Sequence, residues 1–134
     1  MNWRRGFTLI EVMVSILTFA VAMIAFSTLF VTTARLNEAS RNLTQAVNDA
    51  RVLMEAMRDR AQSVGLAGPG GVTLTYPQGA NLAPAFGLAS LVNESITATY
   101  ANPNADPLPV TVQVSWQESG RNRSMSLDTL LTRR

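Results

Sequence analysis

The sequence predicts an α+β fold in which one long N-terminal helix packs, by its second half, on a small antiparallel sheet of three or four strands. Between Phe7 and Val64 there is neither glycine nor proline, whereas all six prolines and seven of the eight glycines come later. Both residue types break helices, and several of the later segments alternate apolar and polar side chains as strands do. We therefore expect a helix over residues 7–64 and a small β-rich head over residues 65–134.

The first half of the expected helix is apolar enough to cross a membrane. Residues 12–34 include no charged side chain. At about 1.5 Å per residue they extend about 35 Å, against about 30 Å for the core of a bilayer. Residues 7–34 are therefore expected to form a transmembrane helix, and residues 1–6 a short basic leader. Arginines flank both ends of the apolar run, so charge alone leaves its orientation open.

The second half of the helix, residues 35–64, is amphipathic. Apolar residues recur at alternating steps of three and four, which is typical of a helix that lies against a globular head. The spacing is also heptad-like, so a coiled-coil seam is the competing interpretation; packing against the chain's own head is favoured. The expected apolar stripe is Leu36, Leu43, Val47, Ala50, Met54, Met57, Ala61 and Val64, and the expected polar surface includes Arg41, Asn48, Asp49, Arg51, Glu55, Arg58 and Asp59.

The head is expected to begin after a helix stop at Gly65 and a run of glycines and proline at residues 68–71. Alternation over residues 72–76, closed by Pro77, predicts a short strand. Residues 78–88 lack periodicity and are interpreted as a loop. Further strands are expected at residues 95–100, 110–116 and 124–130, the last two joined in a hairpin by a turn at residues 118–122.

Composition argues against an enzyme. The chain has no cysteine and no histidine, so it lacks disulfides, thiolate metal sites and the commonest catalytic base. No cofactor and no metal are expected. The formal net charge is +2, from 11 basic and 9 acidic residues. Loss of the leader would remove Arg4 and Arg5 and balance the charges, so the basic pI indicates little about nucleic acid.

The stretch RGFTLIE at residues 5–11, followed at once by the apolar helix, resembles the class III signal of type IV pilins and type II secretion pseudopilins. The resemblance implies cleavage between Gly6 and Phe7 by a prepilin peptidase, and N-methylation of Phe7 by the same enzyme. It also implies a single-pass protein of the bacterial inner membrane, with a cytoplasmic N-terminus and a periplasmic head that later joins a filament. An ordinary secretory signal peptide is disfavoured because Glu11 would interrupt its apolar core.

Glu11 is the residue that an anchor alone would not need, because a carboxylate at the membrane is costly. Cleavage would create a positively charged amine on Phe7, one helical turn away. We expect the two charges to pair, within a subunit or between neighbours, so that Glu11 aligns subunits during assembly. The alternative is that Glu11 only stabilises the helix N-terminus through the dipole.

By the same resemblance, the expected function is that of a minor pilin or minor pseudopilin that primes or joins a filament. Its partners would be the peptidase, other pilins and an inner-membrane assembly platform. A DNA- or surface-binding tip pilin and a bitopic scaffold outside any filament remain as alternatives. The choice among type IV pilus, type II secretion and competence stays open.

Two further clusters in the head are interpreted as structural. Residues 102–106 space oxygen-bearing side chains like a calcium loop, but Pro107 and Gln113 stand where the loop needs glycine and glutamate. Nucleic-acid binding is not expected of the basic residues, because acidic side chains lie beside them and no aromatic side chains are interleaved. These basic residues are Arg121, Arg123, Arg133 and Arg134.

Overall fold

The computed structural model describes residues 8–88 and 90–132. A single helix, α1 (Leu9–Ser63), extends over 55 residues, and it contributes to two compact units. One unit comprises the residues up to Ala39, and the other begins at Ser40. The predicted α+β class is therefore confirmed, with helix ends within two residues of those expected; Phe7 lies outside the described residues.

The first unit includes the apolar part of α1, whose side chains are exposed. It includes an 18-residue window with a mean hydropathy of 2.4, none of which is buried within the protein. The hydroxyl groups of this part hydrogen-bond back to carbonyls of the preceding turn, for example Ser15 to Glu11 at 2.7 Å and Ser27 to Met23 at 2.8 Å. Such internal bonds let polar side chains lie in an environment without water.

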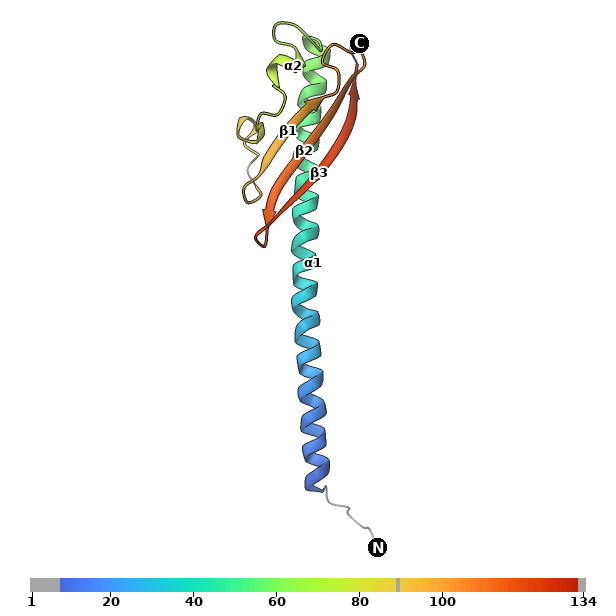
Figure 1. Cartoon of the computed structure of the whole chain (residues 1–134), viewed down its shortest axis with the longest axis vertical. Helices are drawn as coiled ribbons and strands as arrows, with labels where there is room; N and C mark the ends of the chain where they lie inside the picture. Colours follow the sequence, from blue (N-terminus) through green and yellow to red (C-terminus); the bar gives the residue numbers. More distant parts are fainter. Residues whose placement is uncertain (1–7, 89, 133–134) are drawn as a thin grey trace. The chain divides into compact units, whose positions relative to one another are not determined.

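The second unit packs the remainder of α1 against an antiparallel sheet in the order β1 (Ser95–Tyr100), β2 (Leu108–Glu118) and β3 (Arg121–Leu131), as Figure 1 shows. The alternation predicted for the strands is observed, because one face of each strand faces the core. The buried strand residues are Ile96, Ala98, Tyr100, Leu108, Val110, Val112, Val114, Trp116 and Leu131.

The helix face in the core overlaps the expected stripe at Ala50, Met57 and Ala61 but is displaced around the helix from the rest of it. Leu53, absent from the expected stripe, is fully buried, whereas Leu43, which belonged to it, is 48% exposed. Asp49, expected on the polar surface, is buried. The expected stripe included Ala50 and Ala61 but omitted Ala46, which is also buried. These alanines let the helix approach the sheet closely. The buried helix residues are Ala46, Asp49, Ala50, Leu53, Met57 and Ala61.

The strand expected at residues 72–76 is wrong: Val72–Thr75 form the short helix α2. The outer edge of β1 is not open to a further strand, because the amides of Gly79 and Leu82 donate to the carbonyls of Ala98 and Ile96 there, at 3.0 and 2.8 Å. The apolar spacing of Val72 and Tyr76 also fits one helical turn, and their backbone groups close that turn at 2.9 Å.

The loop expected at residues 78–88 is irregular except for one turn of 3-10 helix, η1 (Ala83–Phe86). The hairpin between β2 and β3 turns through only two residues, Ser119 and Gly120, both with positive φ (49° and 76°). This is the turn geometry that matches the twist of paired strands, and glycine adopts it without strain. The expected hairpin is thus confirmed, with a tighter turn and longer strands.

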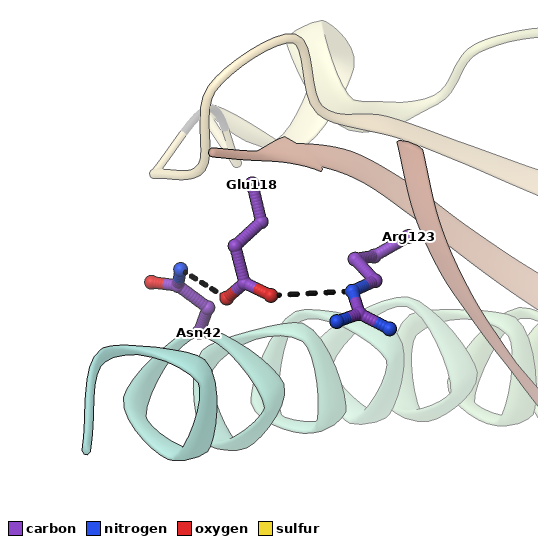
Figure 2. Close-up of polar contacts among 3 residues, drawn as sticks. All are labelled: Asn42, Glu118 and Arg123. Carbon is purple, nitrogen blue, oxygen red and sulfur yellow. Dashed lines mark hydrogen bonds and ion pairs between the residues drawn. The ribbon is translucent and has the colours of Figure 1, made fainter. Parts of the chain in front are cut away.

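The turn end of this hairpin is tied to α1 by Glu118, as Figure 2 shows. Asn42 donates its Nδ2 to Glu118 Oε1 at 2.9 Å. Arg123 Nε lies 3.3 Å from Glu118 Oε2, with 11% of the glutamate side chain and 57% of the arginine side chain exposed. One carboxylate therefore joins the helix, the end of β2 and the start of β3.

Substituting Glu118 by alanine is expected to lower the free energy of unfolding by about 1–3 kcal/mol, because a mostly buried carboxylate is lost and Asn42 keeps an unmatched donor. Arg123→Ala is the matched control, with an expected loss of only about 0.2–1 kcal/mol because the arginine is largely in solvent. Urea unfolding of the full-length protein in detergent micelles measures both values. Equal losses would contradict the central position assigned to Glu118.

Candidate functional site: the start of the apolar helix

Of the three site residues predicted from sequence, only Glu11 lies within the described residues. Gly6 and Phe7, the expected cleavage and methylation sites, lie outside them. Glu11 is in the first turn of α1 and is exposed. An acidic side chain in this position is favoured by the partial positive charge of the helix N-terminus.

Thr8 and Glu11 form a reciprocal cap at the start of α1. Glu11 Oε2 lies 3.4 Å from both the amide nitrogen and the hydroxyl of Thr8, and the Glu11 amide lies 3.4 Å from the same hydroxyl. This is a capping box, in which the side chains at the first and fourth positions satisfy each other's free backbone donors. Sequence reasoning missed Thr8, although the spacing Thr-x-x-Glu is a recognised signal for this motif.

The cap engages Glu11 only weakly. Distances of 3.4 Å are long for hydrogen bonds, whose usual range ends near about 3.2 Å. The carboxylate is also exposed, so it can bind a stronger donor without losing a buried contact. The cap supports the dipole interpretation of Glu11 and is compatible with the charge-pair interpretation, because a 3.4 Å contact is readily exchanged for an ionic one.

The side chains that follow Glu11 form a continuous apolar surface around the helix. Large residues such as Leu9, Phe19 and Phe30 are each more than 65% exposed. Contiguous apolar surface of this extent is found where a protein meets a membrane or another protein. The arrangement therefore consists of one carboxylate at the start of the apolar part of α1, in which every described hydroxyl is bonded internally or at the cap.

In the other two clusters, Asn102 and Arg123 make local structural contacts. Asn102 Oδ1 accepts the amide of Asn104 at 3.2 Å, so the loop at residues 102–106 uses this oxygen in a turn. Among the described residues there is no group of three or more acidic, histidine or cysteine side chains that could hold a metal. Arg123 pairs with Glu118, and Arg133 and Arg134 lie outside the described residues.

The comparison with family models identifies the same segment. Residues 4–27 match the model described as the prokaryotic N-terminal methylation motif. No curated protein and no solved structure matches the chain. The match covers Gly6, Phe7, Thr8 and Glu11 and continues into the exposed apolar part of α1. The N-terminal segment of this chain is therefore that of a type IV pilin-like prepilin.

Proposed function

We propose that the protein is a minor pilin or minor pseudopilin, a non-enzymatic subunit that primes or joins a type IV pilus or a type II secretion pseudopilus. The observation that carries the proposal is the exposed apolar helix that begins within the methylation motif. The apolar surface of this helix is buried in the bilayer before assembly. Once the subunit leaves the bilayer, the same surface must be covered by apolar neighbours to stay out of water. A filament of like subunits supplies those neighbours.

In this proposal the chain enters the inner membrane with its N-terminus cytoplasmic and its head periplasmic. Prepilin peptidase cuts between Gly6 and Phe7 and methylates the new amine of Phe7. The partners are this enzyme, other minor and major subunits, and the inner-membrane assembly platform. The small head, built on three strands without cysteine, favours the minor class over major pilins with a disulfide loop.

Glu11 is proposed to pair with the amine of Phe7 on a neighbouring subunit. In apolar surroundings an unpaired charge costs several kcal/mol, roughly 3–5 kcal/mol when one partner of a buried pair is removed. A subunit is therefore stable in the filament only where its carboxylate meets a partner's amine. The weak cap to Thr8 would hold the carboxylate near the helix start before that pairing forms.

Processing is tested by the mass of the N-terminal peptide after co-expression with a prepilin peptidase. The expected product lacks residues 1–6 and carries one methyl group on Phe7. Gly6→Leu is expected to remain uncut, because a side chain at this position blocks approach of the protease to the backbone. Thr8→Val serves as the control that should still be cut. A wild-type chain left intact by an active peptidase would favour the bitopic scaffold instead.

A further inference from the structure

Two carboxyl groups in the head, those of Asp49 on α1 and Glu94 just before β1, both accept a hydrogen bond from Ser90. Asp49 of α1 is only 3% exposed. Its Oδ1 accepts Gln45 Nε2 at 3.1 Å, and its Oδ2 accepts the Ser90 hydroxyl at 3.4 Å. Gln45 Nε2 also lies 3.2 Å from the Ser90 hydroxyl. A buried aspartate is thus linked to the Ser90–Glu94 segment by neutral groups.

Glu94 belongs to the same segment and uses only one of its oxygens. Oε2 accepts the amides of Ser90 and Leu91, both at 3.0 Å, which closes the segment into a tight loop. Oε1 is buried and has no hydrogen-bond donor among the described residues. Leaving a buried acceptor without a donor costs free energy. A proton on Oε1, or a hydrogen-bond donor beside it, would remove that cost.

The neighbour that β2 contributes does not neutralise these carboxyl groups. The β1–β2 register ends with Ser95 opposite Ser115, and continuing it by one residue would place Glu94 beside Trp116, a buried residue of β2. Trp116 contributes only a buried indole N–H, which also has no acceptor among the described residues. It offers a hydrogen-bond donor and no positive charge.

No described cation compensates the two acids. The ion pairs within the described residues are Arg58 with Glu55 and Arg123 with Glu118. Neither includes Asp49 or Glu94. Glu118, the remaining acid on β2, is bonded to Asn42 and Arg123.

We propose that Asp49 and Glu94 share one proton, and that this proton latches the Ser90–Glu94 segment to α1. Two ionised carboxylates are acceptors only and repel each other, whereas a protonated Glu94 donates from Oε1 to Asp49. The proton thus satisfies the orphaned oxygen and removes one of two buried charges. Its release leaves like charges side by side, and the segment opens toward solvent, where both can be hydrated.

The protonation behaviour of Glu94 agrees with this geometry. Burial raises the pKa of Glu94 above its usual value, and the adjacent Asp49 raises it further by hydrogen bonding and charge, against the lowering effect of the Leu91 and Ser90 amides. The closed form therefore holds its proton more tightly than the open form. The latch is stable at low pH and weakens as pH rises from the ordinary glutamate range through the raised pKa of Glu94.

Hydrogen exchange of the full-length protein in detergent micelles, followed by mass spectrometry from pH 4 to 8, tests the latch. After correction for intrinsic exchange, opening of the peptide that includes Ser90 and Leu91 should increase by up to about tenfold per pH unit in the titration range. Glu94→Gln is the protonated mimic, because its amide donates permanently. It should stay protected, with no pH dependence. Identical pH profiles for Glu94→Gln and wild type would overturn the proposal.

Asp49→Asn distinguishes two causes of the raised pKa of Glu94: a proton shared with Asp49, and burial of Glu94 alone. It removes the like charge that raises the pKa of Glu94, so the pH dependence should shrink and move to lower pH. An unchanged profile would show that burial of Glu94 alone sets its titration, which contradicts sharing. Peptides from β2 should remain protected throughout, as proof that the variant is folded. If Asp49→Asn unfolds, the infrared band of a protonated carboxyl group decides instead: it must be present in wild type and absent in Glu94→Gln.

Discussion

Glu11→Gln is expected to abolish incorporation of the subunit into filaments while leaving membrane insertion and cleavage intact. Glutamine fits the capping box as well as glutamate does, so the helix start is preserved and only the charge is lost. The amine of the neighbouring Phe7 would then be buried without a partner, at a cost of about 3–5 kcal/mol. That cost corresponds to a loss of roughly a hundredfold or more in incorporation.

Thr8→Val is the matched control, because it removes the hydroxyl of the cap and keeps the carboxylate. Loss of a cap costs about 0.5–2 kcal/mol of local helix stability. The rest of the 55-residue helix should remain folded despite this loss. We therefore expect Thr8→Val subunits to enter filaments. The measurement is the share of mature subunit in the sheared filament fraction of cells that carry the assembly machinery. Retention of Glu11→Gln together with loss of Thr8→Val would show that Glu11 is only a cap.

Leu53→Ala is expected to cause the largest loss of stability in the head, about 2–5 kcal/mol. Leu53 is fully buried between α1 and the sheet, and truncation leaves a cavity that a thin core cannot refill. The free energy of unfolding of a domain is typically only about 5–15 kcal/mol, so this single change would remove a large fraction of it. Urea unfolding in micelles, followed by the fluorescence of Trp116 in a Trp3→Phe background, measures it.

Leu43→Ala makes the same chemical change on the same helix at a position that is 48% exposed. Exposed substitutions usually change stability by no more than about 0.5 kcal/mol. The two leucines also distinguish the expected stripe from the observed one, since Leu43 belonged to the former and Leu53 belongs to the latter. A larger effect at Leu43 than at Leu53 would show that α1 packs by the expected face.

The long helix and the strands were predictable because each depends on local pattern. A run without glycine or proline must be helical or extended, and its length and periodicity favour a helix. The hairpin of β2 and β3 follows from alternation interrupted at Ser119 and Gly120. Such features need no knowledge of what lies opposite.

The errors in the head occurred where a local pattern permits two structures. Val72 and Tyr76 fit both a strand and one turn of helix, and the choice depended on Gly79 and Leu82 occupying the edge of β1. From the sequence, Asp49 is expected to be a surface charge. In the structure it is buried, and Gln45 and Ser90 bond to its carboxylate. In each case the deciding partner lies in another part of the chain.

At the candidate site, the sequence alone identified the candidate residue: a carboxylate, Glu11, at the start of an uninterrupted apolar helix, within the segment that matches the N-terminal methylation motif. These features depend on chain order and side-chain chemistry, which folding does not alter. Only the tertiary structure decided which face of α1 is buried and which acids meet. Leu53 enters the core because the sheet covers one face of α1, and Asp49 is joined to the segment before β1 through Ser90. Which face of α1 is buried depends on contacts between segments far apart in the sequence, and such contacts cannot be predicted from a local pattern of residues.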